Sequence, residues 1–92
     1  MQKRIILLLA RNYAQARECA ERHRLDQSDW AYISGPLSIV GLRNAVVWRV
    51  GDYYCRDDLH SVESMIERAI QTQGFTEQYE PDVLKEVICA QQ

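Results

Sequence analysis

The most continuous apolar stretch of the chain runs from Ile5 to Leu9, within the segment 4–10. Five large aliphatic residues in succession leave no polar face, so neither an amphipathic helix nor a half-exposed strand fits this pattern. The run is also too short to cross a membrane as a helix. It is typical of a central parallel strand buried on both faces, and such a strand needs crossover helices on both sides of its sheet. The pattern therefore predicts an α/β fold.

A helix is predicted to follow this strand and to begin at Asn12, a favourable N-cap residue. Gln15 lies at the third helical position, where its side chain can hydrogen-bond the Asn12 backbone N–H and complete a capping box. The residues expected on the sheet-facing side, most of them small, are Tyr13, Ala16, Ala20 and His23, with Cys19 beside them. The basic cluster 22–24 falls in the last turn, where it complements the helix dipole; a phosphate-binding patch is the alternative.

Further strands are expected downstream. Residues 30–34 form a short aromatic stretch that Gly35 and Pro36 end, and Pro36 is well placed to begin a single-turn helix. Residues 45–50 form a β-branched third strand that is interrupted by one arginine. Alternation over residues 75–79 allows a short fourth strand at the sheet edge.

Two more helices complete the pattern. Apolar residues at helical spacing over 59–70 predict a helix that Asp57 or Asp58 caps and Gly74 ends. A last helix opens at residues 80–82, and its apolar stripe consists of Val83, Leu84, Val87 and Ile88.

The expected topology follows from the handedness of the connections. Right-handed crossovers place the first strand between the second and the third, in the order 2-1-3, with a fourth strand beyond the third. We therefore expect one α/β domain over residues 1–92, a small two- or three-layer sandwich with a mainly parallel sheet.

Composition and charge narrow the functional classes. The formal net charge is −2, so no overall field attracts the chain to nucleic acid or to an anionic membrane. The basic residues are nine arginines and two lysines. This excess of arginine has two explanations, a GC-rich genome or planar, bidentate recognition of carboxylate or phosphate.

The cysteines and the N-terminus indicate a cytoplasmic protein. Cys19, Cys55 and Cys89 are odd in number and form no C-x-x-C motif, which argues against a disulfide framework and a closed cysteine-type zinc site. Free thiols suit a reducing compartment. The basic and then apolar N-terminus resembles a signal peptide, but the apolar run is short and Arg11 stands where a small-residue cleavage site is needed.

Candidate chemistry is expected at the carboxyl ends of the strands, because ligands of open parallel sheets bind where the strand order reverses. The residues placed there are Arg11 and Asn12, the pair 34–35, and the loop 51–58. A nucleotide site also needs a glycine-rich loop whose backbone N–H groups converge on phosphate. Residues 10–13, Ala-Arg-Asn-Tyr, contain no glycine.

The acidic loop offers a second candidate. Asp52, Cys55, Asp57, Asp58 and His60 are residue types that bind metal ions, and magnesium accepts two carboxylates and waters. Helix capping by the Asp pair is the simpler interpretation. The sequence contains no nucleophile elbow and no recognisable triad. We therefore expect a protein that is not an enzyme, with no catalytic residues, no cofactor and no bound metal.

The order of motifs resembles a group of small phage-encoded proteins. The segments that carry this likeness are RIILLLARNYAQARECA, WAYIS and GLRNAVVWRVG, and it extends over residues 4–74. These proteins look like a trimmed P-loop or Rossmann-type NTPase core that lacks the phosphate-binding loop. The resemblance implies an α/β sandwich from a phage or prophage gene, located in the cytoplasm of the host cell, and implies no catalytic residues.

The sequence favours a non-catalytic binding protein that occludes or alters a host protein, for example by inhibiting a defence or nucleic-acid-processing complex. The expected contact residues are Arg11, Asp52, Tyr53, Tyr54 and Arg56, because tyrosine and arginine are enriched in interface hot spots. Two alternatives remain: a small nucleotide- or nucleic-acid-binding regulator that uses Arg11 and Asp52, and a structural subunit that forms a homodimer or larger assembly through the last helix. No membrane partner is expected.

Overall fold

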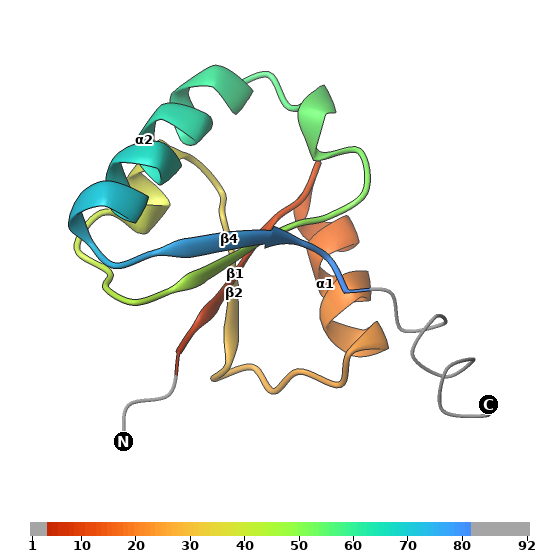
Figure 1. The fold of residues 1–92 in the computed structure, drawn as a ribbon. Coiled ribbons are helices and arrows are strands. Elements are labelled where there is room, and N and C mark those ends of the chain that lie inside the picture. The colour runs from red at the N-terminus through yellow and green to blue at the C-terminus, as the bar shows by residue number, and fades with distance from the viewer. Residues whose placement is uncertain (1–3, 82–92) are drawn as a thin grey trace, which may run out of the picture.

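The structure is a computed structural model of the chain, and it describes residues 4–81. Within this range the backbone alternates between strands and helices (Figure 1). The elements are β1 (Ile6–Leu9), α1 (Tyr13–Arg22), β2 (Trp30–Tyr32), the 3₁₀ helix η1 (Pro36–Ile39), β3 (Val46–Arg49), the 3₁₀ helix η2 (Tyr53–Cys55), α2 (Leu59–Thr72) and β4 (Thr76–Tyr79).

The strands described form one parallel sheet in the order β2-β1-β3-β4. Leu8 of β1 lies opposite Tyr32 of β2 and Trp48 of β3, so the apolar run is the inner strand that its pattern predicts. The fourth strand forms and pairs with β3, with Tyr79 opposite Arg49. The predicted fold class and strand order are therefore confirmed. The predicted last helix, from residue 82 onward, lies outside the described residues.

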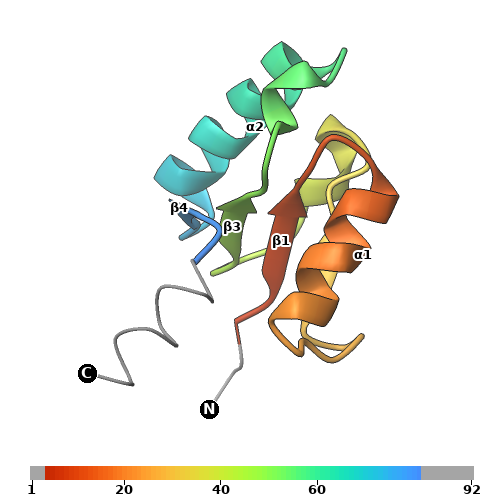
Figure 2. The same ribbon diagram turned by 90° about the vertical axis from the view of Figure 1, so that its right-hand side faces the viewer.

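The sheet separates two apolar layers, because successive side chains of a strand point to opposite faces. Helix α1 covers one face, and α2 with η1 covers the other (Figures 1 and 2). The core on the α2 side includes Leu7, Leu9, Ile33, Ile39, Val47, Val62, Ile66, Ala69 and Phe75. The core on the α1 side includes Leu8, Ala10, Ala16, Cys19, Ala20, Trp48 and Val50. The domain is thus a three-layer sandwich.

Helix α1 follows its predicted pattern with two differences. Asn12 caps it as expected, since its side-chain oxygen accepts a hydrogen bond from the Gln15 backbone N–H at 2.9 Å. The Gln15 side chain does not complete the capping box and instead accepts a hydrogen bond from the Arg11 backbone N–H at 2.7 Å. Tyr13 is 56% exposed rather than buried, and its ring lies beside those of Trp30 and Tyr32 on the edge strand β2.

Helix α2 buries Val62, Ile66 and Ala69 against the sheet. It ends at Thr72, and Gly74 follows with a positive φ of 71°, as its position in the sequence predicts. Asp58 is the N-cap residue, but its carboxylate makes no capping hydrogen bond and binds another side chain. Within residues 4–81, no helix is both long enough and apolar enough to cross a membrane.

Candidate functional site

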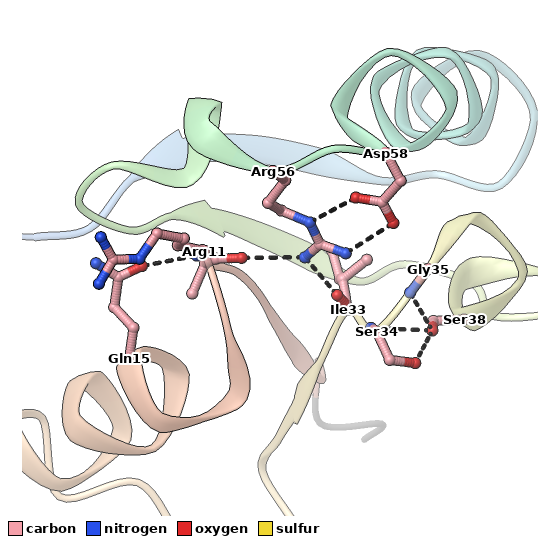
Figure 3. A network of polar contacts seen from close by, with 9 residues as sticks. Arg11, Gln15, Ile33, Ser34, Gly35, Ser38, Arg56 and Asp58 are labelled. Atoms are coloured by element: carbon pink, nitrogen blue, oxygen red, sulfur yellow. Dashed lines mark hydrogen bonds and ion pairs between the residues drawn. The ribbon is translucent and has the colours of Figure 1, made fainter.

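Arg56 links the carboxyl ends of two strands to the start of α2 (Figure 3). Its Nη1 donates to the carbonyl oxygens of Ala10 and Ile33, the residues directly after β1 and β2. Its Nε and Nη2 donate to the two carboxylate oxygens of Asp58 at 2.9 and 3.0 Å. The side chain of Arg56 is only 4% exposed, so its donors are directed into the domain.

The Arg56 guanidinium also lies 5.4 Å from the centre of the Tyr32 ring. Its hydrogen bonds hold the pKa of the Asp58 carboxyl below the usual range, because the charged form of the acid is the one that accepts them. Asp58 was expected as a helix cap and Arg56 as a contact residue. The Asp58 carboxylate binds Arg56 and makes no capping hydrogen bond, so the predicted capping role of this side chain is wrong. The contact role of Arg56 stays a prediction.

A second network joins the segment after β1 and the first turn of α1 to the segment after β3. Arg11 Nη1 lies 2.7 Å from Asp52 Oδ2, and Gln15 Nε2 donates to Asp52 Oδ1 at 2.8 Å. The hydrogen bond from Gln15, together with a backbone N–H and the Arg11 charge, lowers the pKa of Asp52 despite some desolvation. Gly51 adopts φ +52°, and a Cβ at this position would lie 2.6 Å from Gln15 Nε2. The glycine therefore permits this close approach.

The positive charges and backbone N–H groups that could contact a phosphate at the strand ends already have partners within the chain. Arg11 and Asp52 bind each other, although half of the Arg11 side chain is exposed. The backbone N–H groups of Ser34 and Gly35, which follow β2, both donate to the Ser38 hydroxyl at 3.2 Å (Figure 3). This edge of the sheet is thus cross-linked by the chain itself.

Three tyrosines form a cluster beside this edge, and we call Tyr53, Tyr54 and Tyr79 the tyrosine cluster. Tyr53 is half-buried against the α2-side core, with its ring 5.7 Å from Tyr54 and 6.5 Å from Tyr79. Tyr54 is 64% exposed and Tyr79 is 70% exposed. Sequence reasoning identified the first two and missed Tyr79, whose only signal was the alternation along β4. A hollow of about 430 Å³ lies next to Tyr53 and Tyr79.

Arg49 packs against the ring of Tyr53 in the tyrosine cluster. Its guanidinium lies 5.3 Å from the centre of the Tyr53 ring and binds Glu63 of α2 and Glu77 of β4. Burial disfavours the charge of Arg49, but the hydrogen bonds to Glu77 and Glu63 outweigh burial and raise the pKa of Arg49. The Arg49 side chain is only 12% exposed, and its two ion pairs connect α2 to β4.

A separate polar cluster lies at the end of α1, and we call Cys19, His23 and Glu80 the Cys–His–Glu cluster. His23 Nε2 lies 2.9 Å from Glu80 Oε2, and Arg22 binds both oxygens of the same carboxylate. Burial and the neighbouring Glu80 raise the pKa of the Cys19 thiol to about 12. Burial opposes the charge of Glu80, yet its hydrogen bonds to Arg22, His23 and Cys19 lower its pKa.

The structure brings together acids and bases that the sequence pattern did not connect. Within residues 4–81, the Cys–His–Glu cluster is the one group of three or more cysteine, histidine and acidic residues whose ligand atoms lie close together. The loop residues Asp52, Cys55, Asp57, Asp58 and His60 form no such group. His23 and Glu80 are 57 residues apart, and no spacing rule relates them.

Comparisons with known proteins identify no relative of this chain. No protein family, no curated protein and no solved structure matches it significantly.

Proposed function

We propose that this chain is a non-catalytic protein-binding domain and that the tyrosine cluster is the centre of its contact surface. The observation that supports this role is the exposure of Tyr54 and Tyr79, at 64% and 70%, with both rings next to the half-buried Tyr53. Tyrosine supplies a large contact area at a low cost in conformational entropy and is enriched in binding hot spots. Two separate elements, η2 and β4, contribute to this one surface.

The surface is held in place before any partner binds. Arg49 lies over Tyr53 and is fixed by Glu63 and Glu77, so the central ring of the cluster has little freedom to reorient. Binding to a preorganised surface loses less side-chain entropy, and the adjacent hollow can accept a protruding side chain of the partner. Arg11 is half exposed and is paired with Asp52, the residue directly before Tyr53 in the chain.

The charged side chains at the strand ends are paired with each other, which argues for a binding role rather than a catalytic one. Arg11 is paired with Asp52, and Arg56 is paired with Asp58. Within the described residues, no buried side-chain nitrogen or oxygen lacks a hydrogen-bond partner. A general acid or base must reach a substrate, whereas these groups bind each other and the backbone.

The resemblance of residues 4–74 to small phage-encoded proteins supports a host protein as the partner, such as a member of a defence or nucleic-acid-processing complex. The fold of the described residues agrees with that resemblance but does not distinguish among partners.

A tagged pull-down from host lysate, with and without nuclease, tests this function. Three proteins are compared: the natural chain, the Tyr54→Ala/Tyr79→Ala variant, and Tyr13→Ala. Tyr13 is the matched control, because it is also exposed but lies beside the opposite edge strand, β2.

The proposal requires a stoichiometric partner that survives nuclease, binds the Tyr13→Ala protein and is lost with the double variant. Affinities of the purified pair then measure the effect, which is about tenfold or more for each hot-spot tyrosine. If a folded double variant still binds the partner, the interface lies outside the tyrosine cluster. Loss of all partners on nuclease treatment would favour nucleic-acid binding.

A further inference from the structure

The Cys–His–Glu cluster joins two distant parts of the chain. Cys19 and His23 are four residues apart, and the His23 N–H donates to the Cys19 carbonyl at 3.1 Å, so both side chains leave the same face of the helical turn. Glu80 follows β4 and approaches from the sheet, where its N–H donates to the Arg49 carbonyl. Sγ, the imidazole nitrogen and a carboxylate oxygen all lie within 4.8 Å of one another.

We propose that Cys19, His23 and Glu80 bind one divalent transition-metal ion, with Zn²⁺ as the favoured ion. Thiolate, imidazole and carboxylate are the three ligand types of protein zinc sites, and three protein ligands leave a fourth position for water. In a tetrahedral site the donor atoms are roughly 3.3–3.8 Å apart, given zinc–ligand distances of about 2.0–2.3 Å. The donor atoms lie within 4.8 Å of one another, so their separations need to change by no more than about 1.5 Å to enclose the ion.

The surroundings fit a metal ion in position and in charge. Cys19 is fully buried, and the side chains of His23 and Glu80 are 10% and 17% exposed, so the donors are largely shielded from solvent. Trp48 packs against the His23 ring at 5.0 Å and restrains its orientation. One thiolate and one carboxylate neutralise a divalent ion.

Arg22 holds the Glu80 carboxylate from outside the cluster. Its Nε and Nη2 donate to the carboxylate at 2.8–3.1 Å, as outer partners of metal-binding carboxylates do. The positive charge of Arg22 also competes with a metal ion for the Glu80 carboxylate. The metal affinity therefore depends on whether one carboxylate can bind Arg22 and the ion together. Such a metal would tie the segment after β4 to the end of α1.

The test uses the full chain after removal of metal with a chelator, and the probes are Zn²⁺ alone and Co²⁺ alone. The chain has three cysteines and two histidines, which provide matched controls. In the Cys55→Ser/Cys89→Ser protein, Cys19 is the remaining cysteine, so a cobalt–thiolate charge-transfer band there reports Cys19. His60→Gln, on the exposed face of α2, is the control for His23→Gln.

The expected result is one equivalent of Zn²⁺ per chain, measured by competition with a chromophoric chelator. The affinity falls by at least about tenfold in His23→Gln and Glu80→Gln and is unchanged in His60→Gln. Absence of the cobalt–thiolate band in the Cys55→Ser/Cys89→Ser protein would overturn the proposal, and so would equal Zn²⁺ affinities of the natural, His23→Gln and Glu80→Gln proteins. Circular dichroism of the metal-free variants verifies that each is folded.

Discussion

Arg56 and Asp58 are joined by two parallel hydrogen bonds, although only one residue separates them in the chain. The same guanidinium donates to the carbonyl oxygens of Ala10 and Ile33. One side chain therefore satisfies backbone groups at the ends of β1 and β2 and orients the first turn of α2. Arg56 was named as a contact candidate because of its residue type, and the structure also gives it a structural role.

The first prediction concerns the stability that this pair provides. Arg56→Ala leaves the Asp58 carboxylate and two carbonyl oxygens without their donor, and we expect it to lower the free energy of unfolding by about 3 kcal/mol. Arg11→Ala is the control, since the Arg11–Asp52 pair is partly exposed and screened by solvent, so its loss should cost much less. Urea denaturation followed by circular dichroism measures both. Equal losses in the two variants would contradict the structural role of Arg56.

The second prediction is a dependence of stability on pH. Hydrogen bonds from Arg56 lower the pKa of Asp58 in the folded protein below the unfolded value of about 3.9. A lowered folded-state pKa contributes stability above the unfolded pKa, and this contribution is lost as the pH falls through the folded value. We expect Asp58→Asn to destabilise the protein at pH 6 and to cost less as the pH falls below about 4.

Urea unfolding of the natural chain and Asp58→Asn across this range isolates the contribution of Asp58, because the pKa values of Asp52 and Glu80 are also lowered and act in both proteins. A penalty for Asp58→Asn that is constant with pH would show that the pair contributes no such linkage.

The fold could be predicted from the sequence because short stretches of the chain, such as the apolar run 5–9, identify its strands and helices. The uninterrupted run 5–9 requires an inner strand, and the handedness of crossovers then decides the strand order without any side-chain contact. The small residues Ala16 and Ala20 likewise indicated the buried face of α1. Tyr13 was assigned to that face by periodicity, but it lies at the first turn and reaches the aromatic side chains of β2 instead.

The polar networks were not accessible in the same way. Arg56 contacts a carbonyl 46 residues away, and His23 contacts an acid 57 residues away. An arginine with five donors has many possible partners, and periodicity does not select among them. The capping assignments failed for a related reason. The side chains of Gln15 and Asp58 bind the side chains of Asp52 and Arg56, and neither makes the predicted capping hydrogen bond.

The third prediction tests the close approach of α1 to the sheet. Ala16 is fully buried in the same apolar layer as Leu8 of β1 and Trp48 of β3. We expect Ala16→Leu to destabilise the domain by about 1–3 kcal/mol, because the added atoms overpack this layer. Ala14→Leu makes the same change on the exposed face of the helix and should alter stability by less than about 0.5 kcal/mol. Thermal and urea denaturation compare the two variants. Similar effects at both positions would show that helix propensity, rather than packing, decides the outcome.

The last prediction concerns Gly51, whose φ of +52° and close neighbour Gln15 make it unlike Gly35. Gly51→Ala places a Cβ 2.6 Å from Gln15 Nε2, so the amide must move away from Asp52. We expect a loss of about 1–2 kcal/mol from the left-handed backbone and the broken hydrogen bond. Gly35→Ala should be nearly neutral, because its backbone is extended and no atom lies within 4 Å of the added carbon. In a Gln15→Ala background the Gly51→Ala penalty should shrink, because the collision is gone and only the backbone strain remains; an unchanged penalty would assign the whole effect to that strain.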